Sequence, residues 1–161
     1  MATGTVLIPL QSVKLPTSNP CQINADTLTF SLLYDATTGE SGSWSFRMPT
    51  NYSSALVIKI QYSMASATSG GVAFDVSIAA VTPLDAEDAQ LAGFASVNTG
   101  TDTVPATAGY MQEISISLTN ADSLAAQDLV ILKVARDPTN GTDTATGDAE
   151  VLAISLEYTS A

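Results

Sequence analysis

Acidic, hydroxyl and glycine residues are concentrated in the stretch RDPTNGTDTATGD, residues 136–148. Carboxylate oxygens bind Ca²⁺, so Asp137, Asp143 and Asp148 are candidate ligands of a metal ion. A calcium loop of the EF-hand type, however, needs an oxygen ligand at its fifth position, and counting from Asp137 that position is Gly141. Asp-Pro and Asn-Gly pairs are strong turn formers. We therefore expect a structured turn before the last strand, with no bound metal and no cofactor.

A second acidic cluster, formed by Asp85, Glu87 and Asp88, lies in PLDAEDAQLA, residues 83–92. Two carboxylates facing each other across a cleft can hydrolyse a glycosidic bond. Three acids just after Pro83 are explained more simply as first-turn residues that stabilise the positive end of a short helix. We expect a helix here and no catalytic pair.

The chain contains no histidine and a single cysteine, Cys21. The usual general base and the commonest zinc ligand are therefore missing, and Cys21 has no imidazole to activate it. We expect no catalytic residues and no enzyme activity.

Aromatic side chains offer another kind of chemistry, because their faces can stack on the apolar faces of sugar rings. Trp44 and Tyr62 are in phase with the apolar sides of predicted strands, which indicates core packing. Tyr52 and Tyr110 flank loops, so we keep these two as possible surface contacts for a glycan.

The composition limits the partners of the protein. Sixteen acids against five bases give a net charge of −11, and twelve of the acids lie in residues 81–161. A chain with so few cations is not expected to bind nucleic acid. Its longest apolar runs, of about five residues, are too short to span a membrane. The first twenty residues lack the pattern of a signal peptide, so no membrane partner is expected.

These side chains must be positioned by strands, because apolar residues recur with a period of two along most of the chain. Each predicted strand has one apolar and one polar face, which is typical of antiparallel sheets. The expected strands are 27–34, 43–48, 56–64, 72–79, 113–119, 129–136 and 149–158, with a weaker one at 93–98.

The pattern predicts an all-β fold, an antiparallel two-sheet β-sandwich of about eight strands and one short helix. Long polar loops at 35–43, 98–110 and 136–148 suggest crossings between the sheets, so the sandwich is expected to be jelly-roll-like. Residues 23–161 would form this single domain. Residues 1–22 contain three prolines and read as an extended N-terminal arm, or equally as the first edge strand. The apolar residues of this segment are the candidate partner-binding residues: Val6, Leu7, Ile8, Pro9 and Leu10.

Residues 43–81, SWSFRMPTNYSSALVIKIQYSMASATSGGVAFDVSIAAV, carry a motif in which a strand ending in F-R-M-P is followed by Tyr, then Y-S-M, a glycine turn and another strand. The matching C-terminal segments are 114–119, 128–137, 143–149 and 151–158. Over about residues 43–158 the chain resembles small β-sandwich virion proteins of tailed bacteriophages. The family's usual Gly-Asp before the penultimate strand is replaced here by Gln127-Asp128, which leaves the turn geometry there open.

The resemblance implies a capsid decoration or cement protein that binds the major capsid protein and copies of itself, commonly as a homotrimer. Such a protein would be made in the host cytoplasm and located on the capsid surface of the virion. The alternative is a jelly-roll module of a tail tip, fibre or other appendage that binds host-surface glycan.

Overall fold

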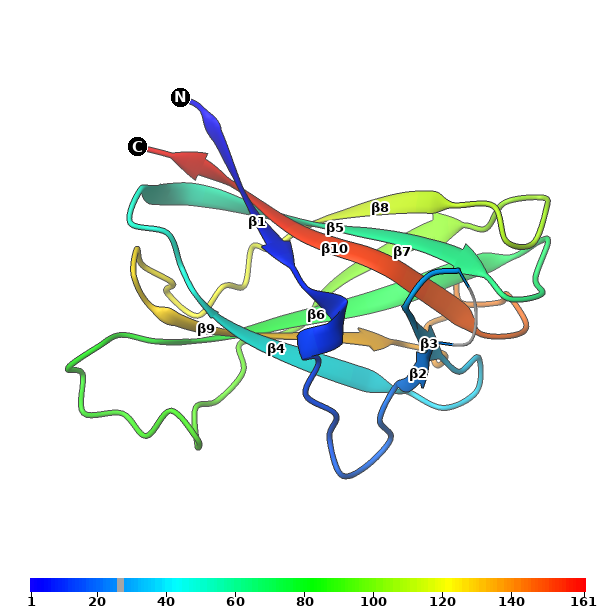
Figure 1. Cartoon of the computed structure of the whole chain (residues 1–161), viewed down its shortest axis with the longest axis horizontal. Helices are drawn as coiled ribbons and strands as arrows, with labels where there is room; N and C mark the ends of the chain where they lie inside the picture. The colour runs from blue at the N-terminus through cyan, green and yellow to red at the C-terminus, as the bar shows by residue number, and fades with distance from the viewer. Residues whose placement is uncertain (26–27) are drawn as a thin grey trace.

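The computed structural model describes residues 1–25 and 28–161. In this part of the chain it contains ten strands and one 3-10 turn, arranged as two packed sheets (Figure 1). The elements are β1 (Thr3–Ile8), η1 (Leu10–Ser12), β2 (Gln22–Asn24), β3 (Ser31–Tyr34), β4 (Ser41–Arg47), β5 (Tyr52–Met64), β6 (Gly71–Val81), β7 (Asn98–Thr103), β8 (Gln112–Ser117), β9 (Leu129–Arg136) and β10 (Ala149–Ser160). No helix in these residues is long and apolar enough to cross a membrane. The predicted all-β sandwich is confirmed.

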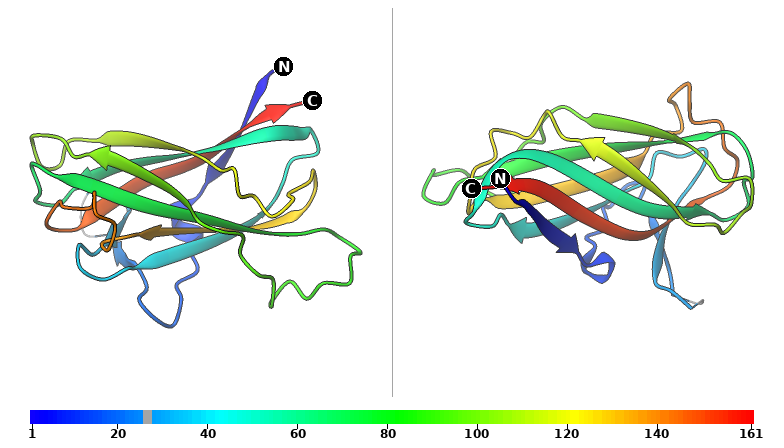
Figure 2. Two further views of the ribbon diagram at one scale, coloured as in Figure 1. Left: turned by 180° about the vertical axis from the view of Figure 1, so that it is seen from behind. Right: turned by 90° about the horizontal axis from the view of Figure 1, so that it is seen from above.

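All strand pairs in the two sheets are antiparallel. Sheet A has the order β2-β3-β10-β5-β8, and β1 pairs with the other end of β10. Sheet B has the order β4-β9-β6-β7. The two views of Figure 2 show sheet A lying over sheet B, with both termini at the same end of the molecule. Chain neighbours such as β4 and β5 lie in different sheets, which is the crossing pattern expected of a jelly roll.

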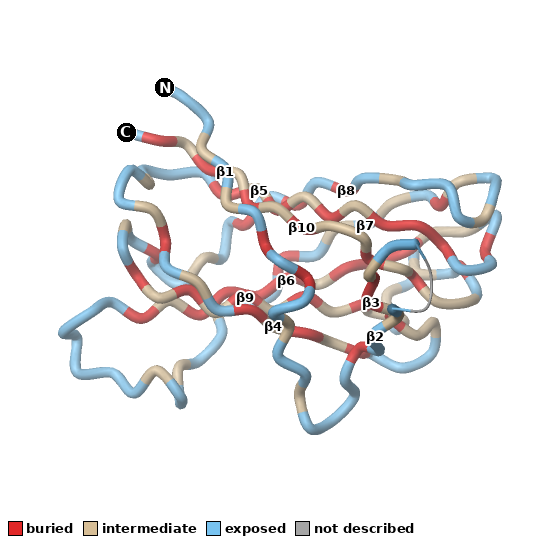
Figure 3. The backbone as a smooth tube through the Cα atoms, viewed as in Figure 1, coloured by how far each residue is buried: buried red, intermediate tan, exposed pale blue. Residues whose placement is uncertain are grey.

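The core lies between the sheets and follows the alternation of the sequence. On β6, Val72, Phe74, Val76 and Ile78 are all fully buried. Figure 3 shows the buried positions concentrated along the facing strands, whereas the loops are exposed. Trp44 of β4 is also buried, as predicted from its phase.

A β-bulge changes the predicted phase of the last strand. The pairing of β10 with β5 shifts register between Val151 and Ala153. An extra residue in one strand turns the following side chains to the opposite face. Val151 is therefore buried and Leu152 only half-buried, whereas an uninterrupted alternation would place Leu152 on the same face as Ile154.

The N-terminal segment is the first edge strand of the sandwich, one of the two alternatives that the sequence left open. β1 pairs with β10 over six residues, from Thr3 opposite Thr159 to Ile8 opposite Ile154. Residues 14–21 then cross to the edge of sheet B, where they bridge β4 at Ser41 and Ser43. The proposed division of the chain after residue 22 stays a prediction.

Two predicted elements are wrong. Residues 83–92 form turns and bends instead of a helix, with Leu84 and Ala86 at positive φ. Leu84 and Leu91 are both exposed, so no apolar face is available to dock this segment, and a helix this short is marginal without docking. The weaker strand predicted at 93–98 is loop, and the strand β7 begins instead at Asn98, inside the predicted loop 98–110.

Candidate functional site

A groove crosses the outer face of sheet B, on the side opposite sheet A. Along β4, Gly42 and Trp44 are buried, whereas Ser43 and Ser45 are on the outer side. Two adjoining hollows on this face, of about 280 and about 460 Å³, share Lys14, Ser43 and Phe94. We call the two hollows together the sheet-B groove. Its lining includes the side chains of Ser12, Lys14, Ser43, Ser45, Gln90, Phe94, Ile131 and Lys133.

Backbone pairing aligns the floor of the groove. Lys14 and Ser43 exchange two backbone hydrogen bonds, of 2.7 and 3.0 Å. Ser43 lies directly opposite Lys133 in the pairing of β4 with β9, and Lys133 lies opposite Ser77 of β6. Side chains of directly opposed residues in antiparallel strands share a face. Lys14, Ser43 and Lys133 therefore form one row across the outer face of the sheet.

Two loops make the walls of the groove, and Figure 1 shows both on the sheet-B side of the molecule. One wall is the segment 12–18, and the other is formed by residues 89–94 of the long loop between β6 and β7. This long loop is anchored by a 2.9 Å hydrogen bond from the amide of Ala95 to the carbonyl of Ile78. Ser77 and Ala79 of β6 are buried although they lie on the outer face, so part of this face is covered.

Phe94 is the exposed aromatic side chain of the groove, with 44% of its surface exposed, whereas Trp44, which also lines the groove, is buried. The ammonium nitrogen of Lys133 lies 5.8 Å from the centroid of the Phe94 ring. This distance permits a cation–π interaction that holds the ring and the ammonium group together at the groove surface. The groove thus presents an aromatic surface, serine hydroxyls, the Gln90 amide and two ammonium groups. None of its described lining residues is acidic.

The acid-rich loop 136–148 is held by a buried ion pair. The guanidinium of Arg136 donates to both carboxylate oxygens of Asp143, at 3.0 and 2.7 Å, and both side chains are almost completely buried. Asp137 accepts hydrogen bonds from Thr139 in a local turn. The backbone carbonyl of Asp148 accepts from the amide of Ala65. Of the three candidate metal ligands, Asp143 is therefore committed to a guanidinium.

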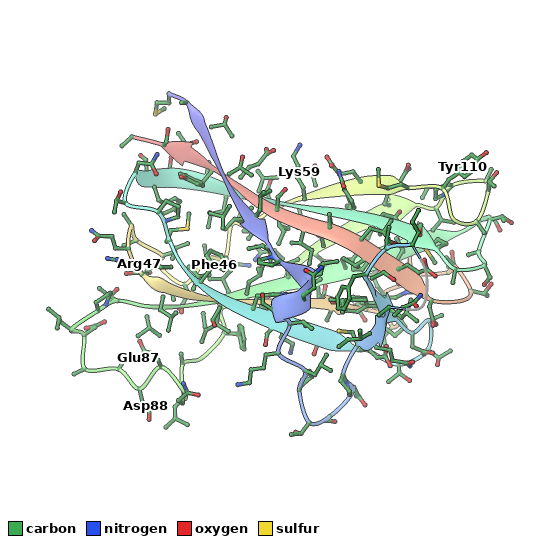
Figure 4. All side chains as sticks on the ribbon, in the orientation of Figure 1. Phe46, Arg47, Lys59, Glu87, Asp88 and Tyr110 are labelled. Atoms are coloured by element: carbon green, nitrogen blue, oxygen red, sulfur yellow. The ribbon has the colours of Figure 1, made fainter. Side chains whose placement is uncertain are left out.

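The described residues contain no group of three or more His, Cys, Asp or Glu side chains that could hold a metal ion. The acids at 85–88 project from the long β6–β7 loop, where Figure 4 labels Glu87 and Asp88. Asp88 accepts a hydrogen bond from the amide of Gln90 and so shapes the loop beside the groove.

A third hollow, of about 610 Å³, lies at one end of the sandwich and is lined by Gly70, Gly71, Thr101, Asp102, Thr103, Thr142 and Thr144. Asp102 accepts a 2.8 Å hydrogen bond from the hydroxyl of Tyr62. Burial, together with this hydrogen bond and the nearby carboxylate charge, raises the pKa of Tyr62 far above its usual value. This hollow is polar and has no aromatic lining residue, so it offers no stacking surface.

The two surface aromatics kept as sugar contacts lie far apart. Tyr52 begins the 13-residue strand β5 and is half-buried against Tyr158, with a ring-centroid distance of 5.9 Å. Tyr110 is 65% exposed in the loop before β8, where the amide of Gly109 bonds to the carbonyl of Met64 at the end of β5. A strand of this length spans about 40 Å, so these rings do not form one platform. Figure 4 shows Tyr110 at one end of the sandwich.

The candidate partner-binding residues of the N-terminus are mostly used within the chain. Ile8 and Leu10 are buried in the core, and Val6 packs against it. Leu7 is 78% exposed, and Pro9 is also exposed. This segment therefore presents Leu7 and Pro9 for contact with a partner.

The sheet-B groove was not predicted from the sequence. Its residues come from four separate segments. Only the strand register places Lys14 in the same row as Lys133, with Ser43 between them. One signal was available: Lys133 is the only charged residue inside the apolar run LVILKVA. Interrupting such a run with a lysine marks a position on an exposed face, although it does not reveal the groove.

No family model matches the chain, and no curated protein matches it either. Solved structures do match over almost the whole chain. A family 35 carbohydrate-binding module from an environmental isolate aligns with a TM-score of 0.58 and 13% identity, covering 97% of both chains. The xylan-binding module CBM15 aligns with a TM-score of 0.56 and 11% identity, covering 99% of both chains.

The C-terminal CBM6 of LamC, a laminarinase from Zobellia galactanivorans, aligns with a TM-score of 0.53 and 15% identity, covering 95% of this chain and 98% of the module. None of these three structures is a virion protein, so they add no support to the resemblance seen in the sequence. At such low identities the comparison establishes the architecture alone. The chain has the jelly-roll β-sandwich fold that is found in carbohydrate-binding modules.

Proposed function

We propose that the protein is a non-catalytic carbohydrate-binding module and that the sheet-B groove is its binding site. The fold is shared with modules described as carbohydrate-binding, one of them xylan-binding. The alternative hypothesis from the sequence, a jelly-roll module that binds glycan, is therefore better supported than the capsid-decoration hypothesis.

The observation that carries the proposal is the placement of Phe94 beside a row of hydroxyl groups in a concave surface. A sugar ring has one apolar face, which an aromatic ring can cover, and a rim of hydroxyl groups that need hydrogen-bond partners. Ser43 and Ser45 project from β4 into the groove, and Gln90 adds an amide from the wall. The two hollows together have the size of a typical ligand site, and their lining is more polar than that of most such sites.

The groove is a better candidate than Tyr110, although that side chain is more exposed. Tyr110 lines none of the three hollows described above. An isolated ring on a convex loop can cover only one face of a sugar and excludes little water from the contact. Binding energy instead concentrates where an aromatic anchor is surrounded by contacts that exclude water.

The test is binding of the intact protein to a glycan array, followed by calorimetry with the polysaccharides that score. Phe94→Ala should weaken binding at least about tenfold, because it removes the stacking surface, a loss of about 1.4 kcal/mol or more. Tyr110→Ala is the matched control and should bind like the wild type. Circular dichroism should show that both variants are folded.

Two results would count against the proposal. One is no measurable binding to any glycan at millimolar concentration. The other is loss of binding in Tyr110→Ala with Phe94→Ala unaffected, which would move the site to the loop before β8. The capsid-decoration role, the homotrimer and the virion location stay predictions from the sequence.

A further inference from the structure

The five cationic side chains of this acidic protein differ in whether they have an acidic partner. Of its five lysine and arginine residues, Lys59 pairs with two glutamates and Arg136 with a buried aspartate. Arg47 donates to the side chain and the carbonyl of Gln127. In the part of the chain that the structure describes, Lys14 and Lys133 have no acidic partner within salt-bridge distance. Both of these unpaired lysines line the sheet-B groove.

The strand register sets the spacing of the backbone positions of the two lysines. Lys14 is bridged to Ser43, and Ser43 lies opposite Lys133. Neighbouring strands are about 4.8 Å apart, so the Cα atoms of the two lysines are separated by roughly 10 Å. Ser43 lies between them in the same row, and its hydroxyl donates a 3.4 Å hydrogen bond to the backbone carbonyl of Lys14, which leaves its oxygen free to accept from a ligand. The groove thus carries two positive charges at a spacing that a single ligand chain can bridge.

Acids close to this face form no ion pair with either lysine in the described part of the chain. Asp75 of β6 is opposite Ala135, one row away from Lys133, and it accepts a hydrogen bond from the hydroxyl of Thr99. Asp88 in the loop is engaged by the amide of Gln90. No lining residue of the groove is acidic, although the chain has sixteen acids. The described side chains that line the groove therefore include cations and no anions, and the nearest acids of the wall loop, Glu87 and Asp88, lie just outside this lining.

We infer that the sheet-B groove selects acidic polysaccharides, with Lys14 and Lys133 binding carboxylate or sulfate groups on the sugar chain. This inference rests on the proposed function and names the ligand class of the same site. Phe94 stacks on a sugar ring, the serine hydroxyls bond to sugar hydroxyls, and the two ammonium groups form charge-assisted hydrogen bonds with the anionic substituents.

The same charges argue against a nucleic acid as the ligand. Affinity for a phosphate backbone grows with the number of neutralised phosphates, commonly six or more contacts, and the groove supplies two. The net charge of −11 also repels a polyanion that does not fit the groove. A ligand gains affinity from both the Phe94 ring and the two lysines only if it has apolar sugar faces and anionic groups at a suitable spacing.

The test uses charged polysaccharides and their neutral counterparts. Polygalacturonate is compared with its fully methyl-esterified form, which keeps the same backbone but removes the carboxylate charge. Dextran sulfate is compared with dextran, so the two pairs distinguish a carboxylate from a sulfate ligand. Calorimetry should show that the protein binds at least one charged form about tenfold or more tightly than its neutral counterpart.

The lysines are tested by the double variant Lys14→Gln with Lys133→Gln. It should lose about tenfold in affinity for the charged form and bind the two forms of the pair alike. Lys59→Gln is the matched control, because it removes one positive charge from the opposite face, where Figure 4 shows Lys59 on the sheet-A side. This control should retain the preference of the wild type.

The outcomes separate this inference from the proposed function. Binding of charged and neutral polysaccharides with equal affinity, abolished by Phe94→Ala, would overturn the inference and leave the binding module standing. A charge preference that survives the double lysine variant would overturn the assignment to Lys14 and Lys133. No binding to any polysaccharide would remove both proposals.

Discussion

The buried ion pair of Arg136 and Asp143 gives the strongest prediction about stability. Arg136 ends β9, and its guanidinium donates five hydrogen bonds. Two go to Asp143, and three go to the backbone carbonyls of Tyr34, Ala145 and Gly147. The side chains of the pair are 0% and 1% exposed. The pair therefore ties the acid-rich loop to strand β3 and to the end of β9.

Asp143→Ala removes the only anion that the guanidinium contacts among the described residues. It leaves two guanidinium donors unpaired, and it also frees the amide of Ala73, which donates to the same carboxylate at 3.0 Å. A buried donor without a partner costs about 1–3 kcal/mol, and breaking a buried ion pair on one side costs about 3–5 kcal/mol. We expect the free energy of unfolding to fall by about 3–5 kcal/mol, a large part of the roughly 5–15 kcal/mol that holds a typical domain together.

Equilibrium unfolding in urea, with linear extrapolation to water, measures this change directly. Asp137→Ala is a matched control in the same loop, because its carboxylate makes only a local turn with Thr139. That substitution should cost about 1 kcal/mol, the net value of an ordinary hydrogen bond. If Asp143→Ala costs no more than Asp137→Ala, the ion pair does not hold the loop and the reasoning is refuted.

Three further predictions concern the core. Burial raises the pKa of the Cys21 thiol to about 11. At about pH 8 a thiol reagent should therefore leave the folded protein unlabelled and react fully in urea, whereas rapid labelling of the native protein would contradict this burial. Burial also raises the pKa of Tyr34 and Tyr62 well above their usual values. Because both phenols stay protonated in the folded state, the free energy of unfolding should fall as the pH rises above about 10, where unfolded tyrosines ionise. Urea midpoints measured across this range check the slope, and a flat profile would show that these hydroxyls are accessible. Gly100→Val should cost about 1–3 kcal/mol, because a Cβ at Gly100 would overlap the side chain of Ile116 between β7 and β8. Unchanged urea unfolding of this variant would show that the two strands do not approach so closely.

The parts of the fold that alternate in sequence were predictable from sequence alone. On β6 the apolar residues from Val72 to Ile78 face the core at every second position, because burial of one face is what fixes the strand. The strand β7, with the sequence NTGTDT, has no such signal. It pairs with β6 from Asn98 to Thr103 through the backbone. Backbone hydrogen bonds leave no trace in the pattern of side chains, and the strand was therefore predicted as loop.

The bulge in β10 and the failed helix have a similar cause. The register shift after Val151 is set by pairing with β5, a strand almost ninety residues earlier, so local alternation could not place Leu152. The helix predicted at 83–92 had a suitable proline and suitable acids, but both of its leucines face solvent. Local propensity is a weak signal when no tertiary surface receives the apolar side chains.

The sequence showed which residue types could form a site. It did not show the partners of these residues, because the contacts depend on the fold. Asp143 was identified as an acid that could bind a metal, and the structure gives it an arginine whose role was not anticipated. The alternation of residues 129–136 agrees with their burial, so the sequence is sufficient to place Lys133 on the outer face of its strand. That a second lysine lies two strands away in the same row depends on the bridge of Lys14 to Ser43, which no local pattern encodes.

The long loop between β6 and β7 connects these observations. Without it, the outer face of sheet B would be an exposed surface carrying a row of lysine and serine side chains. The loop contributes residues 89–94 to the groove and places the ring of Phe94 5.8 Å from the ammonium group of Lys133. A helix in residues 83–92 would have used its backbone groups internally, whereas the irregular chain places Gln90 and Phe94 along one wall of the groove. The irregular loop therefore supplies one wall of the groove, and the regular strands beneath it fix the spacing of the lysine backbone positions.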